Sequence, residues 1–513
     1  MSAWTSGYVT DLGYTHGFYR ELTPALLSFL ALIRAQRGLE PGAPLNYCEL
    51  GCGQGLSMNL LAAANPQVQF HATDFNPSQI AGARALADEA SLANVAFYDY
   101  AFADFADAPG LPESFDIIAL HGIYSWISEE NRAAIVALVR SKLKVGGLVY
   151  VSYNALPGWS AAAPMRHLMY LHGRAKGGPT VSRLEPALAF VDQMQQAGAA
   201  FFRVNPGLKD RFERVKGQSR NYLAHEYLND AWTLFYHSEV ATEMSAAKLS
   251  FLGSAALLEQ VDAINLTPEQ QQIMAGIEDP VLRETVRDYM TNQQFRRDVF
   301  VKGPVPLTPQ ATQEALLDRR FALSVARTDV TLKVAGSQGE ATLQSEVYTP
   351  LLDVLSGGAK TVREMLGDPA VASLGWARLQ QALTVLVGAG YLQPCLPAKD
   401  EGKRAKSVKT FNNAVLQRAR DSAELQFLAS PVTGGGVSVG RFQQLFLLAQ
   451  AEGKKQPEDW AEFTWKVLAS QGQKILKDGK ALETNEENLA ELKGQAATFA
   501  EKQLPVLKSL LIA

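Results

Sequence analysis

The stretch YCELGCGQGLSMN, from Tyr47 to Asn59, contains the features that decide the fold. It begins as an apolar strand, passes through an acid and three glycines at alternate positions, and continues into helix-forming residues. A glycine-rich turn between a strand and a helix is typical of α/β domains that hold a ligand at the carboxyl edge of a parallel sheet. The spacing of the glycines therefore decides which class of ligand the loop can hold.

Short apolar runs alternate with helical segments around this stretch. The runs are apolar at nearly every position, as strands buried on both faces require. Strands separated by helices predict right-handed crossovers and a parallel sheet with helices on both faces, so the expected fold class is an α/β, Rossmann-like core. The expected strands are 45–50, 68–74, 94–100, 115–122 and 146–154, and the expected helices are 56–65, 77–92 and 131–143.

Residues after about 160 lose this alternation, which indicates further segments beyond the core. A proline-rich stretch near 302–309 reads as a linker. The predicted division is a core over 1–160, a helical insertion over 161–222, the closing helix and strand of the core over 223–301, a winged-helix-like middle domain over 310–397, and a helical C-terminal domain over 398–513. An alternative interpretation of residues 223–301 is that they form a separate small domain.

Local patterns add detail to this division. A helix is expected to begin at Ser238 and to lead into a strand over 249–255, after which residues 264–300 read as helical. The last long helix of the middle domain carries Arg378 as its only cation, which favours an interaction role over DNA binding. The charged run AKDEGKRAKSVK, 398–409, reads as a solvated linker.

The bulk composition excludes several classes of function. The chain has 513 residues and a formal net charge of -4, so no overall positive field draws it to nucleic acid. We find no apolar run near the roughly 20 residues of a membrane span and no secretory signal, and therefore expect a cytoplasmic protein. The cysteines, Cys48, Cys52 and Cys395, predict free thiols and lack the neighbours that a metal site needs.

Two common glycine loops do not fit the opening stretch. A triphosphate-binding loop needs a lysine directly after its last glycine, and Gly55 is followed by Leu56. A dinucleotide-binding loop needs its third glycine five positions after the first, and Leu56 occupies that position when it is counted from Gly51. Both phosphate-binding interpretations therefore fail.

The remaining interpretation places one acid before the glycines and a second acid at the end of the next strand. Glu49 precedes the glycines, and Asp74 lies 23 residues after the first of them. An acid about 20 residues beyond such a loop can accept the ribose hydroxyls of a nucleoside. A ligand with a carboxylate and two cationic groups, but no pyrophosphate, suits backbone N–H groups beside acids. S-adenosylmethionine is therefore the expected cofactor, with S-adenosylhomocysteine as product, and the loop glycines that would contact it are Gly51, Gly53 and Gly55.

Two further residues are candidates for the adenine end of this cofactor. Asp104 follows the third strand, where an acid can bind the adenine amino group, and its alternative role is a helix cap or a surface acid. Phe75 directly follows Asp74, and either lies on the adenine face or packs in the core.

From about residue 7 to 260 the chain resembles the class I S-adenosylmethionine-dependent methyltransferases, and more narrowly the bacterial group that carries a methyltransferase regulatory domain. The narrower resemblance rests on the segments YTHGFYRELTP, FDIIALHGIYSWIS, VSYNALPGW and NYLAHEYLNDAWTLFYHSEVATEMSAAKLSFLGSA. That group includes rickettsial-type protein lysine methyltransferases that act on outer-membrane proteins and have extra middle and C-terminal domains. The resemblance implies S-adenosylmethionine as cofactor and a protein lysine as acceptor.

The acceptor is expected at the loops after the fourth and fifth strands, because ligands lie beyond the carboxyl ends of strands at the point where strand order reverses. His121, also a candidate cofactor contact, could remove the proton from a lysine amine or simply bond the backbone at the strand end. Tyr124, a second catalytic candidate, and Trp126 either form an acceptor channel or pack on the next helix. The acceptor-side candidates after the fifth strand are Tyr153, Asn154 and Trp159.

Aromatic residues are also dense before the first strand. Tyr14, a third catalytic candidate, and Tyr19, an acceptor-side candidate, lie in a segment that either folds over the cofactor or packs on the sheet. The segment HEYLNDAW, 225–232, suits a substrate-binding edge, an interface between domains, or the contact of a homodimer.

The predicted function is methyl transfer to lysine side chains of a protein. The alternatives are a small-molecule methyltransferase of a biosynthetic or surface-polysaccharide pathway, and a non-catalytic module that binds the cofactor. The large C-terminal part favours a macromolecular acceptor, because a metabolite needs little more than a pocket.

Overall fold

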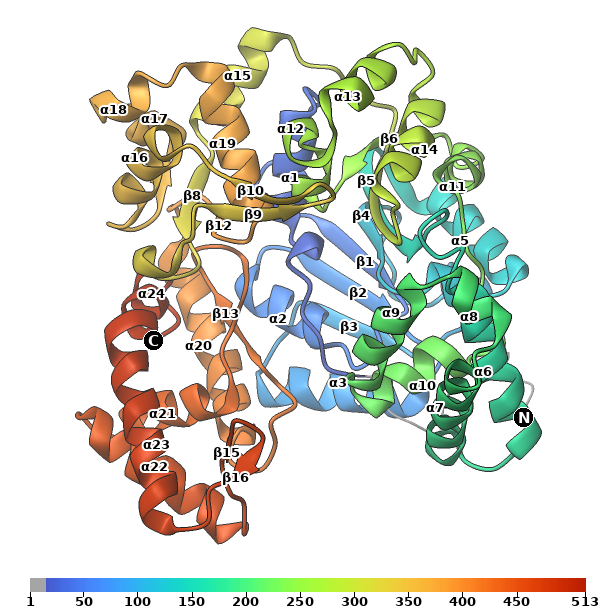
Figure 1. Cartoon of the computed structure of the whole chain (residues 1–513). Coiled ribbons are helices and arrows are strands. Elements are labelled where there is room, and N and C mark those ends of the chain that lie inside the picture. The colour runs from blue at the N-terminus through green and yellow to red at the C-terminus, as the bar shows by residue number, and fades with distance from the viewer. Residues whose placement is uncertain (1–14) are drawn as a thin grey trace.

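A seven-stranded sheet forms the centre of the computed structural model, which describes residues 15–513 (Figure 1). Its strand order is β3-β2-β1-β4-β5-β7-β6. The first five strands are parallel, and β7 runs antiparallel to both of its neighbours. The strands are β1 (Asn46–Leu50), β2 (Gln69–Thr73), β3 (Val95–Tyr98), β4 (Phe115–Leu120), β5 (Leu143–Asn154), β6 (Leu249–Ser254) and β7 (Phe295–Lys302). The strand order reverses between β1 and β4, and the α/β fold class is confirmed.

Helices connect the parallel strands as the pattern predicts. All nine residues of α2 (Leu56–Ala64) are buried, because segments from the C-terminal part cover the side of this helix that faces away from the sheet. Helix α3 (Pro77–Glu89) begins at the cap Asn76, whose side chain accepts a hydrogen bond from the Ser78 amide. Helix α5 (Glu129–Lys142) is capped in the same way by Ser128.

A group of helices is inserted between β5 and the last two strands of the sheet. Figure 1 shows this group in green, beside the sheet and away from the C-terminal helices. Its apolar side chains, among them Met165, Leu188 and Phe212, form a hydrophobic cluster of their own together with Trp159. The inserted helices are α6 (Ala163–Lys176), α7 (Thr180–Gln196), α8 (Ala200–Val204), α9 (Gly207–Lys216) and α10 (Arg220–Leu228).

The expected closing helix and strand correspond to α11 (His237–Ser245) and β6. The expectation that residues 264–300 are entirely helical is wrong, because Phe295–Lys302 forms β7 between β5 and β6. Two charged residues of this strand, Arg296 and Asp298, are buried and paired at 2.9 Å. The strand therefore lacks the continuous apolar run that marks the others. The helices before it are α12 (Asp262–Asn265), α13 (Pro268–Ala275) and α14 (Pro280–Thr291).

The middle part of the chain combines helices with a three-stranded sheet in the order β11-β8-β12. Its helices and strands follow one another in an order compatible with a winged helix, which stays a prediction. The elements are α15 (Pro309–Leu317), β8 (Arg320–Leu323), β9 (Lys333–Gly336), β10 (Gly339–Thr342), α16 (Ser345–Leu355), β11 (Lys360–Thr361), α17 (Val362–Met365), α18 (Pro369–Ala372), α19 (Trp376–Gly388) and β12 (Leu392–Cys395).

The C-terminal part begins with α20 (Glu401–Arg418), which corrects the prediction of a solvated linker over 398–409. From Glu401 onward those charged residues form the first turns of an 18-residue helix whose Val408, Phe411 and Val415 are buried. Helix α20 packs beside α2 of the core. The elements that follow are β13 (Phe427–Ser430), β14 (Gly435–Ser438), α21 (Arg441–Ala451), α22 (Pro457–Ser470), β15 (Leu476–Lys477), β16 (Lys480–Ala481), α23 (Asn485–Thr498) and α24 (Leu504–Ser509).

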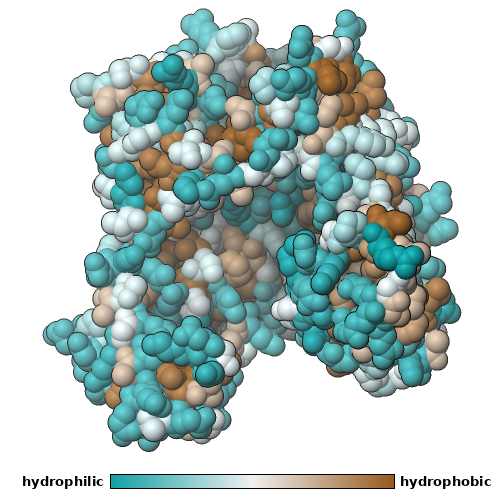
Figure 2. Space-filling view, viewed as in Figure 1, coloured by the Kyte–Doolittle hydropathy of each residue, from teal (hydrophilic) through white to brown (hydrophobic). Residues whose placement is uncertain are grey.

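The surface is hollowed between the C-terminal helices and the inserted helices. Figure 2 shows two hydrophilic lobes on either side of this hollow, with more apolar side chains inside it than on the tips of the lobes. In Figure 1 the core sheet lies behind the hollow, with the carboxyl ends of β1 and β4 turned toward the inserted helices. Of the helices within residues 15–513, none is long and apolar enough to cross a membrane.

Candidate functional site

A cavity of about 160 Å³ lies at the carboxyl ends of β1, β2 and β4, where the strand order reverses. This is the place at which open parallel sheets hold their ligands. Of the predicted site residues, the cavity is lined by Glu49, Gly51, Gly53, Gly55, Asp74, Phe75, His121, Trp126 and Tyr19.

The glycine loop between β1 and α2 forms one wall of this cavity. Gly51 and Gly55 both have positive φ angles, of 75° and 67°, which residues with a Cβ rarely adopt. A Cβ on Gly51 would lie 2.5 Å from Cγ2 of Ile123, and one on Gly55 would lie 2.5 Å from the Cβ of Ala83. The loop therefore needs these glycines both for its turns and for the close approach of its neighbours.

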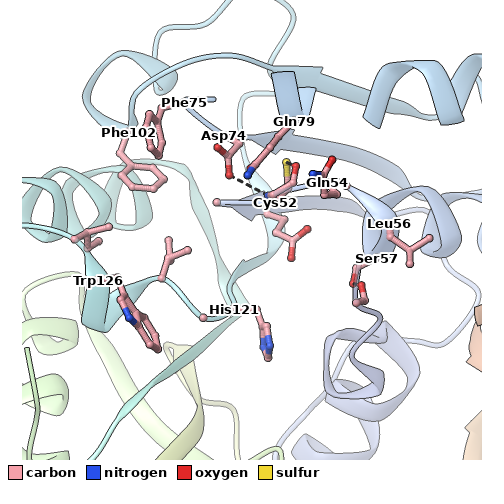
Figure 3. Close-up of a pocket in the computed structure, with 18 of the residues that line it drawn as sticks. Cys52, Gln54, Leu56, Ser57, Asp74, Phe75, Gln79, Phe102, His121 and Trp126 are labelled. Atoms are coloured by element: carbon pink, nitrogen blue, oxygen red, sulfur yellow. Dashed lines mark hydrogen bonds between the residues drawn. The ribbon is translucent and has the colours of Figure 1, made fainter. Parts of the chain in front are cut away.

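Two carboxylates flank the loop but are held differently. Asp74 accepts a hydrogen bond from the amide of Gly53 at 2.9 Å (Figure 3). It accepts another from the amide of Asn76 at 3.0 Å. Glu49 is 4% exposed, and no described residue donates a hydrogen bond to its Oε2. Burial, together with the nearby charge of Asp74, raises the pKa of Glu49 to about 8. The pKa of Asp74 is also raised by burial, although its two amide bonds oppose the shift.

Aromatic side chains form the end of the cavity beyond Asp74. Figure 3 shows Phe75 and Phe102 close together on this side, and Gln79 between them and the glycine loop. Phe102 is the first residue of the short helix α4 (Phe102–Phe105). Two aromatic rings beside a carboxylate suit a nucleoside, whose base can stack while its ribose is hydrogen-bonded.

His121 and Tyr19 lie at the opposite end of the cavity. Their rings are 3.6 Å apart between centroids, and the His121 Nδ1 is 2.9 Å from the Tyr150 hydroxyl. Burial and the neighbouring Arg297 lower the pKa of His121 to about 3. The imidazole is therefore neutral near pH 7. Trp126 lies on the same side of the cavity, within the loop after β4 (Figure 3).

The other predicted site residues do not line this cavity. Asp104 is exposed on α4. Tyr124 is fully buried and its hydroxyl donates to Glu243, while the Tyr153 hydroxyl donates to the buried Asp298 at 2.6 Å. Asn154 and Trp159 line a separate cavity beside the inserted helices. Tyr14 lies outside the described residues.

Sequence reasoning missed several residues that line the cavity. The sequence predicts Cys52 only as a free thiol, and burial raises the pKa of this thiol well above the usual range. Gln79 lies one turn into α3, where no motif marks it. A signal was available for Phe102, because it lies in the same loop as the predicted Asp104. The missed side chains at the cavity are Thr15, Cys52, Gln54, Leu56, Ser57, Gln79, Tyr100, Phe102, Ile123, Ile127, Ser128 and Asn131.

Comparison with known families agrees with this geometry. The family described as a methyltransferase domain matches residues 48–149, which span the glycine loop and β1 to β5. The family described as a predicted methyltransferase regulatory domain matches residues 219–302, which end the sheet. The chain belongs to the class I S-adenosylmethionine-dependent methyltransferases that carry this regulatory domain, and S-adenosylmethionine is its cofactor. The predicted family resemblance, methyltransferase activity and cofactor are confirmed.

Its relatives extend this likeness over the whole chain. The uncharacterized protein sll1526 of Synechocystis sp. is 46% identical over 510 residues, which cover 99% of this chain and 100% of that protein. The uncharacterized protein RP789 of Rickettsia prowazekii is 27% identical over 251 residues, or 48% of this chain and 44% of its own length. A structure of PKMT2 from Rickettsia typhi in complex with AdoHcy has the same fold, with a TM-score of 0.70, 18% identity, and coverage of 98% of this chain and 100% of that one.

Proposed function

We propose that the enzyme transfers methyl groups to lysine side chains of a protein. The observation that carries this proposal is the position of Tyr19, which lines both the cofactor cavity and a larger cavity of about 460 Å³. Glu21 and Arg297 of the core line the larger cavity on one side, and Gln393 and Phe427 of the middle and C-terminal parts line it on the other. An acceptor that reached the cofactor by this route would contact all three parts of the chain, as a macromolecule does and a metabolite need not.

The residues of the cofactor cavity fit the ammonium, the ribose and the adenine of S-adenosylmethionine. The Glu49 carboxylate suits the ammonium group, because a buried oxygen without a donor is costly until a cation is placed beside it. Asp74 suits the ribose hydroxyls, and the rings of Phe75 and Phe102 suit the adenine. When bound, the cofactor supplies an activated methyl group that is ready for an in-line displacement.

The acceptor end of the cavity supplies position rather than a strong base. A lysine side chain has an ordinary pKa of about 10.4 and must lose its proton before it can attack. The pKa of His121, about 3, makes that imidazole a poor proton acceptor. We assign His121 to positioning Tyr19, on which its ring lies. The aromatic rings of Tyr19 and Trp126 would desolvate the amine, which favours its neutral form, and the proton would leave to water.

Two observations support a protein acceptor. The hollow between the lobes is open to solvent on the face that Figure 2 shows, so a large partner could approach between them. The likeness to PKMT2 from Rickettsia typhi extends over 98% of this chain, so the middle and C-terminal parts belong to the shared fold. That structure contains AdoHcy, the expected product at the cavity described above.

The experiment that tests the proposal uses cofactor labelled in its methyl group. The enzyme is incubated with a cell extract, and the proteins are separated from the small molecules. The proteins are then hydrolysed, and the labelled compounds of both fractions are identified by mass spectrometry. Labelled methyl-lysine is the expected result, and the Asp74→Ala variant should reduce the label. Label confined to small molecules would favour a small-molecule methyltransferase, whereas no label despite measurable cofactor binding would indicate a binding module.

A further inference from the structure

A separate polar cavity of about 270 Å³ lies between the inserted helices and the carboxyl end of β5. It has no role in holding the cofactor, whose cavity lies at the ends of β1, β2 and β4. The side chains that determine its chemistry are Asn154, Trp159, Arg211, Tyr222, Glu226 and Tyr227.

Glu226 of α10 is the acidic group of this cavity and is 8% exposed. Within residues 15–513, the one hydrogen-bond donor to its carboxylate is the Asn154 amide, at 3.3 Å. Burial raises the pKa of Glu226 to about 7, although the Asn154 bond and the charges of Arg166 and Arg211 oppose this shift. A buried carboxylate with one donor is costly unless a further partner arrives.

The basic groups near this carboxylate are occupied by other partners. The Arg211 guanidinium lies 4.1 Å from the centre of the Trp159 ring and donates to the Gln294 Oε1 at 2.8 Å. Arg166 donates to the backbone carbonyl of Asn229 at 2.6 Å. Arg214, the other arginine that lines the cavity, is exposed and therefore lies at the rim. The deep part of the cavity consequently presents a carboxylate, an amide and aromatic rings.

This cavity adjoins the acceptor end of the cofactor cavity. The Asn154 backbone N–H donates to the Ser125 Oγ at 2.9 Å, and Ser125 directly precedes Trp126, which lines the cofactor cavity. Burial and the nearby Glu226 and Tyr227 raise the pKa of Tyr222, and Tyr19 at the cofactor cavity adds to this shift. A protein segment that lies along the 121–126 loop could reach both cavities.

We propose that the cavity around Glu226 binds a lysine side chain of the protein substrate. The ammonium would pair with Glu226 and the Asn154 amide oxygen, and the methylene chain would lie between Trp159, Tyr222 and Tyr227. A primary ammonium on an unbranched chain satisfies the buried carboxylate and covers the aromatic walls with apolar surface. The inference rests on the proposed function, because it assigns the cavity to the same acceptor.

A binding experiment with a minimal probe tests this inference on the full chain loaded with S-adenosylhomocysteine. The probe is Nα-acetyl-lysine N-methylamide, and the matched probe without a charge is the norleucine analogue. Saturation-transfer NMR titrations should show binding of the lysine probe only, and Glu226→Gln should weaken that binding at least about tenfold. The control variant is Glu213→Gln, which makes the same change on the exposed surface of α9 and should leave binding unchanged.

The outcomes separate this inference from the proposed function. Equal binding by wild type and Glu226→Gln, equal binding of the two probes, or no binding of the lysine probe would overturn the site. Cofactor affinity of Glu226→Gln should match that of the wild type and its Tm should be no lower, because the change removes a buried group whose pKa is raised, and both results would show that the variant is folded. Glu226-dependent binding without methyl-lysine in labelled proteins would support the site and contradict the proposed function. Methyl-lysine formation by Glu226→Gln with an unchanged KM for the protein substrate would support the proposed function and contradict the lysine site at Glu226.

Discussion

Glu49 and Asp74 end neighbouring strands, yet their carboxylates serve different purposes. Asp74 is largely satisfied by the amides of Gly53 and Asn76 and therefore fixes the glycine loop. Glu49 has an oxygen that receives no hydrogen bond from residues 15–513, at a position that faces the cavity. Asp74 therefore has backbone partners before any ligand binds. In the proposed function it also binds the ribose, and Glu49 gains its missing partner from the ammonium group of the cofactor.

Cofactor affinity should depend on pH through Glu49. Without cofactor, its pKa of about 8 leaves the carboxyl largely protonated at pH 6. If the ammonium of the cofactor pairs with ionised Glu49, as proposed, binding must remove this proton, and affinity should fall by up to about tenfold per pH unit below 8. Calorimetric titrations of S-adenosylhomocysteine between pH 6 and 8 check this slope. Glu49→Gln should bind more weakly at pH 8 and lose the slope; an unchanged slope in this variant contradicts the assignment.

The same group should affect the stability of the enzyme without cofactor. Burial raises the pKa of Glu49 from its ordinary value of 4.5 to about 8, so the folded state holds the proton more tightly than the unfolded state does. The stability from this proton is present below pH 4.5 and is lost as pH rises toward 8. Glu49→Gln should therefore raise Tm at pH 8 relative to wild type, with a smaller difference at pH 5. A variant that is less stable than wild type at pH 8 would show that the carboxylate is well compensated.

Removing Asp74 should weaken cofactor binding through the loop as well as through the ribose. In Asp74→Ala the amides of Gly53 and Asn76 lose their acceptor, at about 1–3 kcal/mol for each buried group left unpaired. We expect the Kd for S-adenosylhomocysteine to rise at least about tenfold, as measured by calorimetry. Asp104→Ala removes an exposed acid outside the cavity and serves as the matched control, with unchanged affinity expected. Equal losses in both variants would contradict the placement of the ribose.

Sequence spacing predicts the site residues that are close together along the chain and misses those that are far apart. Glu49, the glycines and Asp74 belong to one strand–helix–strand unit, so their spacing alone predicts where they meet. Asn154 and Trp159 are expected at the acceptor end of the cofactor site, but they line the cavity of Glu226 because the inserted helices fold over the end of β5. No local pattern contains that information, since Glu226 is distant in sequence from β5. Contacts between distant segments are the ones that sequence spacing does not encode.

At the scale of elements, the close packing of α2 depends on the glycine that begins it. Gly55 has a φ of 67°, and a Cβ there would lie 2.5 Å from Ala83 and 2.8 Å from Phe97. Helix α2 can therefore approach α3 and β3 only when position 55 lacks a side chain. Helix α2 in turn packs against α20, β13 and β14, so this contact also places the C-terminal part.

Gly55→Ala should accordingly be more destabilising than an alanine at another glycine with a positive φ. Gly146 is the matched control, because its φ is 82° and a Cβ added there would have no described atom within 4 Å beyond its chain neighbours. Gly146→Ala should cost about 1 kcal/mol from backbone strain, whereas Gly55→Ala adds steric overlap and should exceed about 3 kcal/mol. Chemical denaturation of the two variants measures the difference. Similar losses would mean that α2 can shift without cost.

The sequence pattern did not predict strand β7 or the start of helix α20, and both contain charged residues. The sequence predicts a helix over strand β7 because Arg296 and Asp298 interrupt its apolar run. The two side chains are paired with each other in the interior. Helix α20 reads partly as a linker because its first turns are charged, and its apolar buried face appears only from Val408 onward. Strand β7 pairs with β5 and helix α20 packs beside α2, and both of these neighbours are distant in sequence, so local hydrophobicity gives the wrong prediction.

At the scale of the whole molecule, a short segment connects the cofactor cavity with the middle part of the chain. Tyr19 lines the cofactor cavity, and the next residue, Arg20, donates to the carbonyls of Val387, at 2.7 Å, and Gly388, at 2.6 Å. These carbonyls belong to the last turn of α19, where a cation both satisfies orphan acceptors and complements the helix dipole. A change in the packing of the middle part would therefore displace Arg20, the residue directly after Tyr19 of the cavity.

Arg20→Ala should loosen this connection without altering the glycine loop. The two carbonyls lose charged donors, at a cost of about 1–3 kcal/mol, and the end of α19 should exchange its amide hydrogens faster. Hydrogen exchange by mass spectrometry over residues 376–395 measures this effect, and calorimetry shows whether cofactor affinity falls through displacement of Tyr19. Arg378→Ala, which replaces an exposed arginine on the same helix, is the control and should leave exchange unchanged. Faster exchange in Arg20→Ala alone, together with weaker cofactor binding, would show that the middle part and the cofactor cavity are energetically coupled. Faster exchange with unchanged cofactor affinity would show that Arg20 only caps the helix.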